Sequence, residues 1–112
     1  MYHLDSKYFL DMSDDNKFDF ALERIRALKP SSEDDEYLLE ISWLYDRIVK
    51  TGSAIPVIDL AYELVLSEDF IGECVSTAME VGFIKTPKRG SKGGEISQKA
   101  LRLLKQTGRQ KN

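Results

Sequence analysis

Apolar side chains recur at intervals of three and four residues along most of this chain, the spacing that places them on one face of an α-helix. The first such stretch, residues 17–29, follows polar residues that can cap a helix and stops at Pro30, which cannot continue one. The second runs to residue 50, with Ser31 and Ser32 as expected N-caps and acidic residues in its first turn. Residues 1–13 show no clean period, so we interpret them as an N-terminal arm.

Two shorter helices are predicted to follow in close succession. Pro56 suits the first turn of a helix over residues 57–66, and Ser67 can cap the next helix, which Gly82 ends. The positions expected to face the core are Ile58, Leu60, Ala61 and Leu64 in the former and Ile71, Cys74, Val75 and Ala78 in the latter.

After Gly82 the pattern changes from helical to extended. Phe83 and Ile84 are expected to begin a strand, the glycine-rich stretch 85–95 to form a hairpin loop, and residues 95–96 to form the returning strand. Ser97 is then the expected cap of a final helix. We therefore expect one domain over residues 14–107 and a frayed tail at 108–112.

This order of elements resembles the winged helix-turn-helix of bacterial and archaeal transcriptional regulators, particularly metal-dependent repressors and multiple-antibiotic-resistance regulators. The matching residues are 60–67, 82–84 and 96–100, and the resemblance covers residues 36–105. Val65 and Ala100 stand where those families commonly have glycine. The resemblance implies a mainly α fold with a small β-hairpin, a winged helix-turn-helix carrying an extra N-terminal helix.

Charge along the chain is segregated although the net charge is only −3. Residues 1–50 sum to −5, residues 51–83 to −6 with no basic residue, and residues 84–112 to +8. A basic end after an acidic body favours binding to phosphates or to an acidic protein. It can also be an ordinary solvated end.

The resemblance and the basic end together predict a DNA-binding regulator of transcription, acting on double-stranded DNA as a homodimer. We expect the wing to supply most of the phosphate contacts and uncharged positions of the fourth helix to approach the bases. The candidate DNA-binding residues are Ser67, Gly72, Ser76, Thr77, Lys85, Lys88, Arg89 and Lys92. Surfaces available for pairing are the helix at 17–29, Trp43 and the last helix.

The fourth helix is unusual for a DNA-reading element, because it contains four carboxylates and no lysine or arginine. Carboxylates facing phosphates are repelled. The alternative hypothesis is therefore a winged-helix protein-protein interaction module that binds a partner through this acidic helix. Phe70 is expected to point outward, either as an interface anchor or, preferably, covered by the N-terminal arm.

Chemistry-bearing residues are sparse. His3 and Cys74 are the only histidine and cysteine, which gives no nucleophile–base pair and no zinc spacing. We expect no enzymatic activity, no metal and no cofactor. A lone thiol and the lack of a long apolar run favour a cytoplasmic protein without membrane contact.

Overall fold

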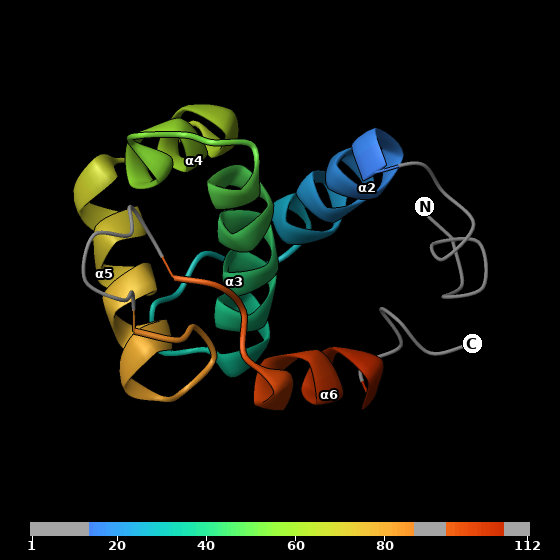
Figure 1. Cartoon of the computed structure of the whole chain (residues 1–112). Helices are drawn as coiled ribbons and strands as arrows, with labels where there is room; N and C mark the ends of the chain where they lie inside the picture. The colour runs from blue at the N-terminus through green and yellow to red at the C-terminus, as the bar shows by residue number, and fades with distance from the viewer. Residues whose placement is uncertain (1–13, 87–93, 107–112) are drawn as a thin grey trace.

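The computed structural model describes residues 14–86 and 94–106, which form helices packed around one central helix. In chain order these are α2 (Asp14–Arg26), α3 (Asp35–Lys50), α4 (Pro56–Leu64), α5 (Glu68–Glu80) and α6 (Gln98–Gln106). α3 contacts all the others, and α4 also packs against α5 (Figure 1). Eleven of the sixteen residues of α3 are buried, among them Trp43 at 1% exposure. The core therefore surrounds α3.

The helix boundaries follow local chemistry, but several differ from the prediction. α2 spans Asp14–Arg26 rather than residues 17–29, so it begins within the expected capping residues and ends before Pro30. The start of α3 also differs. Asp34, rather than Ser31 or Ser32, is its N-cap, because the Asp34 carboxylate accepts a hydrogen bond from the Glu36 amide at 3.0 Å. Ser31 instead accepts from the Glu33 amide at 3.2 Å, which forms a turn before the helix. The Ser67 cap is confirmed, since its hydroxyl accepts from the Phe70 amide at 3.0 Å.

The predicted winged fold is wrong, because the described residues contain no β-strand and hence no β-hairpin wing. Ile84 and Ile96 form only an isolated antiparallel bridge, flanked by hydrogen bonds from the Lys85 amide to the Glu95 carbonyl and from the Ser97 amide to the Phe83 carbonyl. Residues 87–93, where the hairpin tip was expected, lie outside the described part of the chain.

On the helical side the pairing stops at one bridge because α5 ends at Glu80 and α6 begins at Gln98. The outer edge of the returning segment and its Ser97 side chain are held by other groups. The Ile96 amide donates to the buried Asp46 carboxylate of α3 at 3.0 Å, and the Ser97 hydroxyl donates to the Gly82 carbonyl. Ser97 Oγ also accepts from the Ala100 amide at 3.1 Å, so α6 begins directly after the bridge. These contacts leave no length for a strand on this side.

The turn between α4 and α5 is built around a valine in an unfavourable backbone conformation. Val65 has φ 56° and ψ 48°, the left-handed region that β-branched residues rarely adopt. The Val65 amide donates hydrogen bonds to the carbonyls of Ala61 and Tyr62 in α4. This C-cap explains why the helix ends at Leu64 rather than at the expected residue 66. Val65 therefore adopts the left-handed conformation of a helix C-cap, a position that glycine commonly occupies.

Replacing Val65 with glycine is expected to raise the free energy of unfolding by about 1 kcal/mol. The left-handed conformation costs an L-residue about 1–2 kcal/mol, partly offset by the greater freedom of glycine in the unfolded chain. The side chain is 86% exposed, so its removal sacrifices little packing. Thermal unfolding measures the effect as a rise in Tm of roughly 4–8 °C. Val65→Ala is the control, and an equal gain from both variants would contradict the strain at Val65.

Candidate functional site

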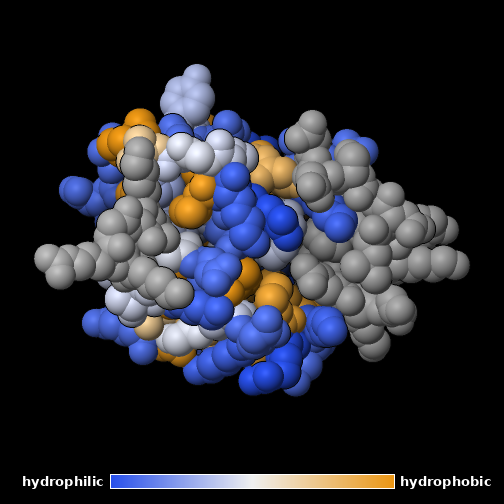
Figure 2. Space-filling view, in the orientation of Figure 1, coloured by the Kyte–Doolittle hydropathy of each residue, from blue (hydrophilic) through white to orange (hydrophobic). Residues whose placement is uncertain are grey.

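The outer face of α4 and its two flanking residues carries apolar side chains exposed to solvent. Ile55, Ile58, Tyr62 and Val65 are exposed by 50%, 42%, 82% and 86%. They are spaced by three, four and three residues, which aligns them on one side of the helix, and we call them the α4 stripe. Figure 2 shows hydrophobic surface at the upper left, over the α4–α5 corner.

The stripe exists because α4 is apolar on two sides. Leu60, Ala61 and Leu64 are buried and pack this helix on the core. Ile58, which was predicted to be an inner residue, belongs instead to the exposed stripe. Sequence reasoning therefore missed this surface, although the near absence of polar residues in α4, only Asp59 and Glu63, was a signal for a second apolar face.

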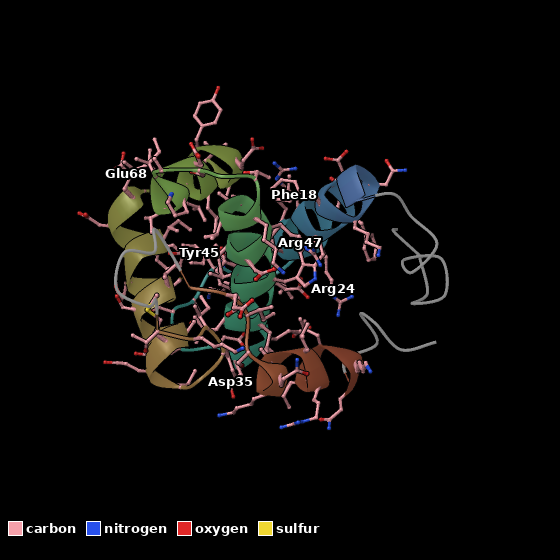
Figure 3. All side chains as sticks on the ribbon, viewed as in Figure 1. Phe18, Arg24, Asp35, Tyr45, Arg47 and Glu68 are labelled. Carbon is pink, nitrogen blue, oxygen red and sulfur yellow. The ribbon has the colours of Figure 1, made fainter. Side chains whose placement is uncertain are left out.

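A groove of about 730 Å³ lies beside the stripe, between α4 and the start of α5. Its apolar lining comes from Ile58, Ala61, Tyr62, Val65 and Leu66. Its polar lining comes from the carboxylates of Glu63 and Glu68 and the hydroxyl of Ser67. No cation lines it. Figure 3 labels Glu68 at the corner where α5 begins next to α4. The groove thus combines an apolar floor with negative charge.

The exposed ridge of α5 extends this negative charge. Asp69, Glu73, Ser76 and Glu80 are exposed, with intervals of three and four residues that place them on one side of the helix. The Glu73 carboxylate accepts a hydrogen bond from Ser32 Oγ at 2.8 Å. Gly72 lies on the same side, and a Cβ added there would meet nothing within 4 Å. The ridge is therefore open and acidic.

The expected DNA-binding residues do not form a cationic surface in the described part of the chain. Ser67 is engaged as the cap of α5, Gly72 and Ser76 lie among carboxylates, and Thr77 is partly buried. Lys85 is exposed, and its ammonium lies 3.3 Å from the Glu95 carboxylate. The remaining three candidates, Lys88, Arg89 and Lys92, lie outside the described residues.

Phe70 and Trp43, which were expected to face outward or to be available for pairing, are partly and fully buried, respectively. Phe70 is partly buried against the core, and its ring centroid lies 6.1 Å from that of Tyr37 at an angle of 56°. Among the described residues, Tyr37 is the aromatic side chain that packs against Phe70. The N-terminal arm, which was expected to cover Phe70, lies outside the described residues. Trp43 is fully buried, so it offers no surface to a second copy of the chain.

Burial suppresses the ionisation of the few nucleophilic groups. Desolvation, with the neighbouring Glu73 charge as a smaller cause, raises the pKa of the Cys74 thiol to about 11. Desolvation also raises the pKa of Tyr37 to about 12, with a smaller effect from Cys74, and raises that of Tyr45. These groups are neutral at physiological pH, so Cys74 is a poor nucleophile.

No three histidine, cysteine, aspartate or glutamate side chains cluster as metal ligands among the described residues. None of the helices there is long and apolar enough to cross a membrane.

Neither a protein family, nor a curated protein, nor a solved structure matches this chain.

Proposed function

We propose that this protein is a non-enzymatic, cytoplasmic interaction module that binds a basic amphipathic helix of another protein. The observation that carries the proposal is the groove between α4 and α5, where an exposed apolar stripe borders carboxylates. An amphipathic helix binds such a surface by laying its apolar side chains into the groove.

The apolar stripe provides the driving force. Its four residues are exposed by between 42% and 86%, so a partner can remove much of their surface from water. Each square ångström of apolar surface buried contributes roughly 25 cal/mol before the costs of association. A contiguous exposed stripe of this kind is typical of an interaction surface rather than of scattered surface residues.

The charge of the surface selects the partner. Glu63 and Glu68 line the groove, and the residues from 51 to 83 contain six acidic and no basic side chains. Such a field attracts a cationic segment and repels nucleic acid phosphates. The acidic α5 ridge therefore favours the protein-interaction hypothesis over duplex DNA.

A labelled model helix of leucine and lysine tests the groove directly by fluorescence anisotropy. We expect binding that weakens with salt, and an affinity at least about tenfold lower for Ile58→Ser combined with Val65→Ser. Glu63→Gln combined with Glu68→Gln should lower it similarly. The matched control is Glu23→Gln combined with Glu33→Gln, which removes the same charge from exposed positions on other segments. Equal affinities for the groove and control variants would overturn the proposal.

Two further measurements distinguish the other candidate partners. Binding of random-sequence duplex DNA at low salt, with loss of that binding in Lys88→Glu combined with Arg89→Glu, would favour DNA as the partner instead. Light scattering that shows self-association, lost in the Glu63→Gln and Glu68→Gln variant, would assign the groove to the basic end of a second copy. Either result would overturn a separate protein as the partner, and their absence is the expected outcome.

A further inference from the structure

A second cavity, of about 730 Å³, lies where α2, the end of α3 and α4 meet. Its walls include Phe18 and Asp19 of α2, Arg47 of α3 and Tyr62 of α4. Figure 3 labels Phe18 and Arg47 in the space between α2 and α3. Tyr62 and Glu63 also line the groove, so the two hollows adjoin across α4 while Arg47 belongs only to this one.

Arg47 is held in place but lacks a carboxylate partner. Its guanidinium lies 4.8 Å from the centroid of the Trp43 ring, a cation–π contact that fixes its orientation. Its Nε atom is buried without a hydrogen-bond partner, and Arg47 forms no ion pair with the residues that the structure describes. A buried donor without an acceptor is costly. Arg47 also lines the cavity, so a ligand carboxylate there would pair with a guanidinium whose charge no carboxylate of the described residues neutralises.

Negative charge lines the rest of the cavity. Asp19, Asp59 and Glu63 contribute carboxylates, whereas the other cation, Lys50, lies 3.0 Å from the Asp46 carboxylate in an ion pair. A simple anion would meet the guanidinium but also three carboxylates. A simple cation would meet the carboxylates but leave Arg47 without a partner. A ligand that carries both charges satisfies both groups.

We infer that this cavity binds a small zwitterion, an amino acid with an apolar side chain. Its carboxylate accepts hydrogen bonds from Arg47, which is suited to carboxylates by its planar fork of donors. Its ammonium group faces Asp19, Asp59 and Glu63, and its side chain packs against Phe18 and Tyr62. The site shares Tyr62 and Glu63 with the proposed peptide groove, whereas Phe18, Asp19 and Arg47 line this cavity alone.

Titration with phenylalanine and two truncated analogues tests the inference. Phenethylamine lacks the carboxylate and 3-phenylpropionate lacks the ammonium group. In calorimetry and in NMR shifts of the cavity residues, phenylalanine should bind at least about tenfold more tightly than either analogue, because each analogue loses one charge-assisted set of hydrogen bonds. Equal affinities for the three compounds, or no response to any apolar amino acid, would overturn the inference.

Two variants localise the binding. Arg47→Lys keeps the positive charge but removes the planar fork of hydrogen-bond donors. Asp19→Asn removes a negative charge from an exposed residue of α2. Each substitution should weaken phenylalanine binding. The matched controls are Arg102→Lys, on the exposed side of α6, and Glu23→Gln. Asp19→Asn keeps the test valid if Arg47→Lys fails to fold. Unchanged binding in Asp19→Asn and in folded Arg47→Lys would contradict the site.

The same samples separate this inference from the proposed function. Ile58→Ser with Val65→Ser should weaken peptide binding in the groove at least about tenfold and leave the phenylalanine response unchanged, because neither residue lines the second cavity. A loss of phenylalanine binding in that variant would instead place the amino acid in the groove and overturn the inference.

Discussion

Replacing Arg24 with methionine is expected to lower the free energy of unfolding by about 3 kcal/mol. Arg24 Nε donates to Glu40 Oε2 at 2.7 Å, and the Glu40 side chain is only 1% exposed. Methionine keeps much of the apolar stem but removes the cation that compensates this buried carboxylate. Breaking a buried ion pair costs about 3–5 kcal/mol, and the 28% exposure of Arg24 places the effect at the lower end. Urea denaturation followed by circular dichroism measures it.

A neighbouring pair provides the control for Arg24. Glu36 lies 3.9 Å from the same guanidinium but is 48% exposed, so Glu36→Gln should cost less than about 1 kcal/mol. Combining Arg24→Met with Glu40→Met should recover much of the lost stability, because an apolar pair needs no counter-charge. If Arg24→Met were as mild as Glu36→Gln, the buried pair would not be a source of stability.

Replacing Asp46 with alanine is expected to lower the free energy of unfolding by about 2–3 kcal/mol and to loosen the segment before α6. The Asp46 carboxylate is 1% exposed, and it accepts the Ile96 amide at 3.0 Å. Lys50 lies 3.0 Å from its other oxygen, close enough for an ion pair although not in hydrogen-bond geometry. Alanine would leave a buried amide without an acceptor. Hydrogen exchange at the Ile96 amide should become faster than the global loss of stability explains.

Two substitutions separate the contributions of Asp46. Asp46→Asn retains an oxygen that can accept from Ile96, so it should lose less stability than Asp46→Ala. Lys50→Gln should cost less than about 1 kcal/mol, because the Lys50 side chain is 52% exposed. Unchanged exchange at Ile96 in Asp46→Ala would show that the carboxylate does not hold this segment.

The helices were predictable because their signals are local. Ser67 caps α5, Pro56 stands in the first turn of α4, and Gly82 adopts a φ of 85° after α5, all of which follow from residue chemistry. The start of α3 was misplaced for a local reason as well. Several residues between 31 and 36 are good caps, and only the geometry at Asp34 selects among them.

The wing was wrongly predicted because strand formation is not a local property. The apolar residues at 83–84 and 96 were interpreted as two strands of a hairpin. In the structure α5 ends at Glu80 and α6 begins at Gln98, close to the single bridge between Ile84 and Ile96. Asp46 of α3, fifty residues away from Ile96, accepts the amide on the outer edge of the returning segment. A pattern shared with winged regulators therefore did not determine the sheet.

By itself the sequence determined which segments are helical and where charge gathers, because capping, periodicity and net charge depend on neighbouring residues alone. Tertiary packing decided which of the two apolar faces of α4 is buried, since Leu60 and Leu64 fit against the core and leave Ile58 and Val65 in solvent. It also decided that Arg47 lies beside a cavity, in contact with Trp43 and without a carboxylate partner among the described residues. Such choices depend on the relative fit of helices distant in sequence, which no local pattern records.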